Sequence, residues 1–233
     1  MTFLRAGQEA PMSEGNGAPG GREFRLLAVP GSTARESQTA RAARAVLERA
    51  GSARPGVRGT CLGPEALRLP AMEVDARASG ALARRPAVRA VCAEVARADA
   101  LVLATPVYQG SFSGALKNLL DHLPMGAFQG KPALVVSVAA KVQGAHGAVD
   151  HLQAVVRALG GWPVPTSVVC AGGDFPADGA PAPEVLRRVD TAIGELLGFR
   201  LAGRGPGQAP APPAPAPAGA APGPRWAGVV EGG

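Results

Sequence analysis

Residues 100–121 read ALVLATPVYQGSFSGALKNLLD, and this stretch decides the fold. Its opening run, Ala100–Ala104, is wholly apolar, which is typical of a strand buried on both faces of a sheet. Four leucines between residues 116 and 123 then recur at the spacing of an amphipathic helix, and Pro124 closes it. A buried strand, a loop and a helix follow one another, which is the repeating unit of an α/β protein.

The same alternation continues on both sides of this stretch. Mainly apolar runs predict strands at residues 25–29, 100–104, 133–138 and 166–170, and residues 57–62 are a further candidate strand. Apolar residues at helical spacing predict helices around residues 40–50, 88–95, 116–123, 149–159 and 185–197, the second beginning near Pro86. We expect Gly51 to cap the first helix and Gly160-Gly161 to end the fourth. The chain is therefore predicted to form a doubly wound parallel sheet with helices on both faces, and ligands bind at the carboxyl ends of such strands.

The loop after the first strand, Pro30–Thr39, is suited to an anion. Small residues let the backbone approach a ligand, and free N–H groups at the start of a helix attract negative charge. The hydroxyls of Ser32, Ser37 and Thr39 can add donors, and Arg35 can add charge. Ser and Thr are equally typical of an ordinary capped turn, so this loop alone leaves a phosphate site and a simple helix cap open. This loop contains neither the G-x-G-x-x-G motif of classical dinucleotide sites nor the G-x-x-x-x-G-K-[ST] motif of nucleoside triphosphatases.

The loop after the third strand carries a more specific pattern. Ala104–Asp121 reads A-T-P-V-Y-x-x-x-x-S-G-x-L-K-x-L-L-D, which resembles the flavin loop of the NADPH-dependent FMN reductase family. The first loop is similar to that family's phosphate loop, G-S-x-R-x-x-S, although Arg35 stands one position later than the family's arginine. The likeness runs from about Phe24 to Phe199. It implies a flavodoxin-like, five-stranded parallel sheet in strand order 2-1-3-4-5.

The resemblance also implies cofactors and site residues. FMN and NADPH (or NADH) would bind, and hydride would pass from the nicotinamide to the flavin without a protein nucleophile or a metal. Ser32, Arg35, Ser37 and Thr39 would hold the phosphate, and Pro106–Gly110 would position the ring. Lys117 could be a solvated helix lysine, and its place one turn after Ser113 also lets it reach the cofactor side. The candidate cofactor-binding residues are Ser32, Arg35, Ser37, Gln38, Thr39, Pro106, Val107, Tyr108, Gln109, Gly110, Ser113 and Lys117.

The loop after the fourth strand, Ser137–Gly147, departs from the family pattern. Ala140-Lys141 stands about where the family usually has paired glycines beside the flavin, and Gly144 and Gly147 come later. His146 falls near a histidine that some members have, but a loop histidine is more often structural or solvated. Read without the family, the second loop could also be a plain strand, turn and helix, with Tyr108 on the surface and Ser113 as a helix cap.

Several functions stay open at this point. The family resemblance favours an FMN reductase that supplies reduced flavin to a partner monooxygenase, and a quinone or azo reductase fits the same scaffold. A flavodoxin-type electron carrier is less favoured, because such carriers are usually acidic and this chain has a net charge of +6. The altered third loop also leaves open a flavin-free binding protein.

Composition narrows the setting of the protein. The positive charge is scattered, with no basic run and interleaved aromatics, so nucleic-acid binding is not expected. Three separated cysteines suggest neither a disulfide framework nor a zinc site, and no apolar run reaches the roughly 20 residues that span a bilayer. We expect one cytoplasmic domain over residues 23–200, a disordered extension over 1–22, a Pro/Ala-rich disordered tail over 201–233, and by family likeness a homodimer or homotetramer.

Overall fold

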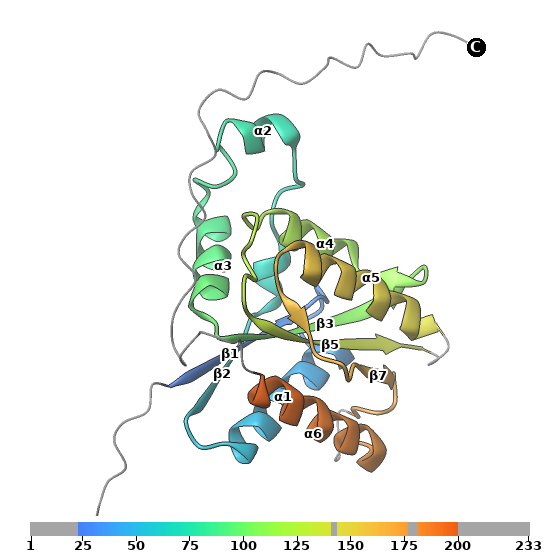
Figure 1. Ribbon diagram of the computed structural model, residues 1–233. Helices are drawn as coiled ribbons and strands as arrows, with labels where there is room; N and C mark the ends of the chain where they lie inside the picture. The colour runs from blue at the N-terminus through green and yellow to red at the C-terminus, as the bar shows by residue number, and fades with distance from the viewer. Residues whose placement is uncertain (1–22, 141–143, 177–180, 200–233) are drawn as a thin grey trace, which may run out of the picture.

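The computed structural model describes residues 23–140, 144–176 and 181–199. Within these ranges the five expected strands form one parallel sheet (Figure 1). They are β1 (Phe24–Pro30), β2 (Val57–Cys61), β3 (Ala100–Tyr108), β5 (Pro132–Ala139) and β7 (Val168–Ala171). The predicted disordered ends lie outside the described residues.

The strand order confirms the flavodoxin-like prediction. β1 pairs in parallel with β2 on one side and β3 on the other, and β3 pairs in parallel with β5. The fifth position is shared by β7 and the two-residue strand β6 (Trp162–Pro163), which pair with opposite ends of β5. The order is therefore β2-β1-β3-β5 followed by this divided edge, which in predicted numbering is 2-1-3-4-5.

Helices cover both faces of the sheet, as predicted (Figure 1). One face carries α1 (Gln38–Ala53) and α6 (Pro183–Gly198), which pack on Ala28, Val102 and Val136. The other carries α3 (Pro86–Arg97), α4 (Gly114–Asp121) and α5 (Ala145–Ala158). Neighbouring residues of one strand alternate between the two cores, as period-2 side-chain geometry requires: Leu101 and Leu103 lie on the α3–α5 face.

Some local expectations were wrong. Gly51 does not end the first helix: α1 continues to Ala53, and the extended residue Arg54 caps it by donating its N–H to the Ala50 carbonyl. Gly51 adopts helical geometry, and a glycine inside a helix is tolerated at a modest cost. The fourth helix does end as predicted, with Leu159 at its C-cap before Gly160.

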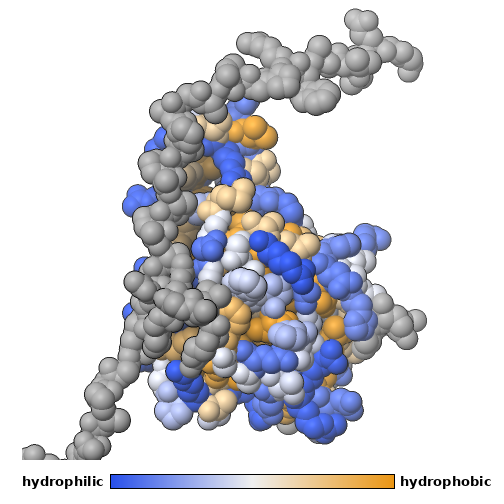
Figure 2. Space-filling view, viewed as in Figure 1, coloured by the Kyte–Doolittle hydropathy of each residue, from blue (hydrophilic) through white to orange (hydrophobic). Residues whose placement is uncertain are grey.

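The segment between β2 and α3 contains two short helical elements that the sequence periodicity did not predict. They are the 3₁₀-helix η1 (Pro64–Leu67) and the helix α2 (Val74–Ala78), which protrudes from the body of the domain (Figure 1). Asn118 of α4 ties this segment down through its side chain, which contacts the backbone of Leu69, Pro70 and Met72. The face shown in Figure 2 is mainly hydrophilic, with apolar side chains also visible over α2, where Val74 is 80% exposed.

Every helix of the described residues is too short or too polar to cross a membrane.

Candidate functional site at the carboxyl edge of the sheet

The parallel register brings the loops after β1, β3, β5 and β7 to one edge. Pro30 at the end of β1 pairs with Ala104, and farther along β3 Pro106 pairs with Val138. Ala139 at the end of β5 pairs with Ala171 at the end of β7. The three loops in which the sequence predicts chemistry therefore leave the same edge, which is where ligands bind in doubly wound sheets.

The loop after β1 forms an open helix N-terminus. Ser37 is the N-cap of α1, and its hydroxyl accepts a 3.0 Å hydrogen bond from the Ala40 N–H. Ser32 is buried, and its hydroxyl accepts from the Ala34 N–H at 3.3 Å. Because both hydroxyls accept from the backbone, each keeps its own proton to donate. Gln38 begins the helix, and its N–H has no intrahelical partner.

The remaining residues of the loop after β1 differ in charge and in exposure. Arg35 is exposed, whereas Thr39 is 2% exposed. The first turn of α1 carries no acidic residue, so nothing within that turn opposes an anion at the positive end of the helix. The side-chain oxygen of Gln38 is buried and accepts no hydrogen bond from the described residues. A buried acceptor without a donor is costly, and this one lies where a ligand is expected.

The second loop is shorter than the sequence suggests, because β3 continues through Thr105, Pro106 and Val107 to Tyr108. A two-residue turn, Gln109-Gly110, then reverses the chain into the short strand β4 (Ser111–Phe112), which pairs antiparallel with the end of β3. Both turn residues have positive φ, 50° at Gln109 and 74° at Gly110, as a type I′ hairpin requires. The expected flavin loop is therefore a β-hairpin, with Tyr108 61% exposed.

Ser113 joins the first and second loops. Its hydroxyl donates to the Gly31 carbonyl at 2.6 Å and accepts from the Leu116 N–H at 3.1 Å, which makes it the N-cap of α4. Its own N–H donates to the Thr105 hydroxyl at 3.0 Å. Ser113 is 2% exposed and its proton is committed to Gly31. Ser113 thus links the two loops, and its direct contact with the cofactor stays a prediction.

Lys117 forms an exposed ion pair on α4, and its role on the cofactor side stays a prediction. Its ammonium donates to both carboxylate oxygens of Asp121 at 2.7 Å, one turn further along the exposed side of α4. The spacing of four residues places the two side chains on the same helix face, which explains the pairing.

Four residues that are not among the candidate cofactor-binding residues complete the edge. Thr105 is buried and links the base of the hairpin to Ser113. Ser111 Oγ and His151 Nδ1 lie 3.0 Å apart, which ties β4 to α5. Arg41, in the second turn of α1, donates to the Phe175 carbonyl after β7 at 3.5 Å. Thr105 is the threonine of the A-T-P-V-Y motif, but its bond to Ser113 and the contacts of the other three residues depend on the packed structure. His146, at the start of α5, is exposed, and Lys141 lies outside the described residues.

The described residues at this edge offer neither an activated thiol nor a metal cluster. Cys170 is the penultimate residue of β7, and burial, with a smaller contribution from the Asp174 carboxylate, raises the pKa of its thiol to about 12. The thiol is therefore protonated near neutral pH and is a poor nucleophile. No group of three or more His, Cys, Asp or Glu side chains gathers in the described ranges in a way that could hold a metal ion.

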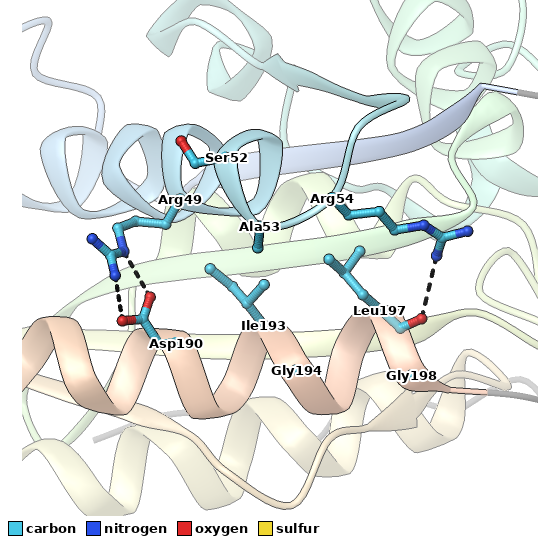
Figure 3. Close-up of a pocket in the computed structure, with 9 residues that line it drawn as sticks. All are labelled: Arg49, Ser52, Ala53, Arg54, Asp190, Ile193, Gly194, Leu197 and Gly198. Atoms are coloured by element: carbon cyan, nitrogen blue, oxygen red, sulfur yellow. Dashed lines mark hydrogen bonds and ion pairs between the residues drawn. The ribbon is translucent and has the colours of Figure 1, made fainter. Parts of the chain in front are cut away.

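A separate groove lies between α1 and α6, far from this edge (Figure 3). Arg49 pairs with Asp190 across it, and Arg54 donates to the Leu197 carbonyl. Arg54 also stacks on Phe24 at the start of β1, which places the groove toward the amino edge of the sheet. Because both helices end there, their dipoles present negative charge and disfavour a phosphate. We therefore place the candidate site at the carboxyl edge.

Comparison with known proteins agrees with this geometry. A family model described as NADPH-dependent FMN reductase matches residues 24–175, which is more than half of the chain. The chain belongs to the NADPH-dependent FMN reductase family. The matched range contains the whole edge built above, from the loop after β1 to the loop after β7.

The individual relatives of this FMN reductase family member match different shares of its chain. An FMN-dependent NADPH-azoreductase of Staphylococcus aureus is 42% identical over 78 residues, 34% of this chain. The chain spans only 41% of that relative's length. A crystal structure of an apo NADH:FMN oxidoreductase, EMOB, superposes with a TM-score of 0.63 and 27% identity over 76% of this chain and 90% of that one. FerB, an NAD(P)H:(acceptor) oxidoreductase from Paracoccus denitrificans, has a TM-score of 0.59 and 22% identity over 75% and 98%, and shows the fold alone.

Proposed function

We propose that this protein is an NAD(P)H-dependent flavin oxidoreductase that holds FMN at the carboxyl edge of its sheet. The observation that carries the proposal is the Ser113 bond to Gly31, which fastens the phosphate-type loop to the hairpin of the flavin-type motif. Two motifs that are 74 residues apart in the sequence, counting from Gly31 to Thr105, thereby meet in one site. Family membership supports the same cofactor.

The phosphate end of FMN fits the loop after β1. Ser32 and Ser37 keep hydroxyl protons to donate, the N-terminus of α1 adds backbone donors, and exposed Arg35 adds positive charge. The buried Gln38 oxygen lacks a donor, and the polyhydroxyl chain of FMN carries donors that this oxygen could accept from. The Gln38 oxygen, which lacks a donor, is thus complementary to the hydroxyl donors of the cofactor.

The hairpin supplies the wall for the ring. Pro106, Val107 and Tyr108 leave the core progressively, from half-buried to exposed, and offer backbone groups and an aromatic surface beside the edge. When bound, FMN supplies the two-electron chemistry that accepts hydride from a nicotinamide. The chain's own contribution is alignment of the two ring systems and N–H donors near developing negative charge.

The electron acceptor is the finer part of the proposal. We favour delivery of reduced flavin to a partner monooxygenase, with FMN exchanging between turnovers. Direct reduction of an azo compound or a quinone is the second candidate, and the azoreductase relative from Staphylococcus aureus favours it. The cytoplasmic setting stays a prediction from the sequence, and the homo-oligomeric state stays a prediction from family likeness.

An anaerobic titration tests the proposal. Purified protein is mixed with FMN, NADPH or NADH is added, and flavin absorbance is followed. Bleaching whose rate depends on protein concentration is the expected result, and the better donor gives the nucleotide preference. Bound FMN with only slow oxidation of NAD(P)H would point to an electron carrier, and no FMN binding would overturn the proposal. Among active outcomes, FMN lost on gel filtration favours flavin supply, whereas retained FMN that reduces an azo dye or a quinone favours the second candidate.

A further inference from the structure

The turn at the tip of the β3–β4 hairpin is held in an unfavourable backbone conformation. Gln109 has φ of 50°, and a side chain other than Gly, Asn or Asp is disfavoured in this left-handed region. Such a conformation persists only where surrounding contacts over-determine it. The exposed Tyr108 directly precedes this turn, so the contacts that hold the tip also set the position of Tyr108.

Helix α5 supplies two contacts to the tip. His151 Nδ1 lies 3.0 Å from Ser111 Oγ, the first residue after the turn. One helical turn earlier, Gly147 packs so closely on the Gly110 carbonyl oxygen that a Cβ there would come within 3.1 Å of it. Gly147 and His151 are four residues apart and share a face of α5. The helix thus touches the turn through a backbone contact and a side-chain hydrogen bond.

The base of the hairpin is fixed independently by Ser113, which binds Thr105 and Gly31. The tip and the base therefore have separate anchors, one on α5 and the other on the loop after β1. A change at the α5 anchor should move Tyr108 and leave the phosphate-type loop in place.

We propose that Gly147 and His151 are positioning residues that set the hairpin tip, and with it the wall of the flavin site formed by Tyr108. The position of the tip follows from the contacts alone, whereas its effect on nicotinamide use rests on the function proposed above. Neither residue needs to touch the cofactor, because both act through Gly110 and Ser111.

The chain offers a clean reporter for this proposal, because Tyr108 is its single tyrosine. Full-length protein labelled with 3-fluorotyrosine should give one ¹⁹F resonance that reports on the tip without any flavin. We expect Ser111→Ala and His151→Ala to shift this resonance in the same direction, and the double variant to match the single ones, because both remove the same bond. His151→Asn, whose amide can replace the Nδ1 contact, should return the resonance toward the wild-type position.

Two further variants sharpen the result. Asp150→Ala removes the adjacent exposed side chain on α5 and should leave the resonance unmoved. Gly147→Ala should shift it, because the new methyl group meets the Gly110 carbonyl. An unmoved resonance in both Ser111→Ala and His151→Ala, or shifts that add in the double variant, would overturn the proposal.

Kinetics test the consequence at the site. With FMN saturating, Ser111→Ala and His151→Ala should each lower kcat/KM for NADPH about fivefold, the loss expected for one partly exposed hydrogen bond. The dissociation constant for FMN, from flavin fluorescence, should stay within about twofold because the other anchor is intact. A shifted resonance with unchanged kcat/KM would overturn the functional half alone. Absence of flavin reduction in the wild type would sink the proposed function, and the ¹⁹F result would still decide the role of α5.

Discussion

The Ser113 hydroxyl donates a 2.6 Å hydrogen bond to the carbonyl oxygen of Gly31, which lies 82 residues earlier in the chain. The Ser113 hydroxyl oxygen also caps α4 by accepting a hydrogen bond from the Leu116 N–H. One buried hydroxyl therefore fixes the start of a helix and the distance between two loops of the candidate site. Loss of this hydroxyl would remove the hydrogen-bond partner of both the Gly31 carbonyl and the Leu116 N–H.

Replacing Ser113 by alanine should weaken both the fold and the site. We expect Ser113→Ala to lower the free energy of unfolding by about 2 kcal/mol, since a helix cap and a buried hydrogen bond are lost together. FMN affinity should fall with it, because the loop after β1 loses its tether. Urea unfolding and flavin fluorescence measure the two effects. Ser52→Ala is the matched control: this exposed serine bonds only the Glu48 carbonyl within α1, and its loss should change stability by less than about 0.5 kcal/mol.

Arg35 and Lys117 give opposite expectations for FMN binding although each carries one positive charge. Arg35 is exposed in the loop after β1, so Arg35→Ala should raise the FMN dissociation constant about tenfold and leave stability nearly unchanged. Lys117 is engaged by Asp121, and Lys117→Ala should leave the dissociation constant within about twofold. Isothermal titration with FMN compares them. An unchanged constant for Arg35→Ala would remove this residue from the phosphate site.

The buried Lys131 is expected to be a major stabilising residue. It is 3% exposed, and its ammonium donates to the carbonyl oxygens of Val95, Ala96 and Ala98 at the end of α3, at 2.7, 3.0 and 2.6 Å. Positive charge is favourable at a helix C-terminus, and these carbonyls would otherwise lack a donor. Lys131→Met should lower the free energy of unfolding by about 2 to 4 kcal/mol. Lys117→Met, at an exposed site, should cost less than about 0.5 kcal/mol; equal stability losses in urea would contradict this account.

Cys170 should make stability depend on alkaline pH. Its thiol is buried in the native state with a pKa near 12, above the ordinary value of 9.0. Above the lower value the unfolded chain loses this proton and the native chain keeps it, so stability falls as pH rises toward 12. Relative to Cys170→Ala, the wild type should lose about 1.4 kcal/mol between about pH 8 and about pH 10. Urea unfolding of both proteins at these pH values checks this, and parallel curves would show that Cys170 does not contribute.

Sequence reasoning recovered the regular parts of this fold. The run Ala100–Ala104 is apolar throughout, and Ala133–Val138 is apolar except for Ser137, which is typical of strands covered on both faces. The stripe Val149–Leu159 likewise has one helical face, and Gly160 follows it as a stop. Local pattern predicted the wrong end for α1, which continues past Gly51 although glycine often ends a helix. It also gave no sign of α2, whose residues show no helical periodicity.

The candidate site divides in the same way. The sequence by itself determined which loops carry small, hydroxyl-bearing and aromatic residues, because turn chemistry and helix capping are local properties. Only the tertiary structure decided that Ser113 is committed to Gly31, that Lys117 turns to Asp121, and that His151 reaches Ser111. Each of these contacts joins a side chain to a polar group that the packing of the elements brings within about 3 Å. Distance along the chain carries no information about such neighbours once strands and helices have packed.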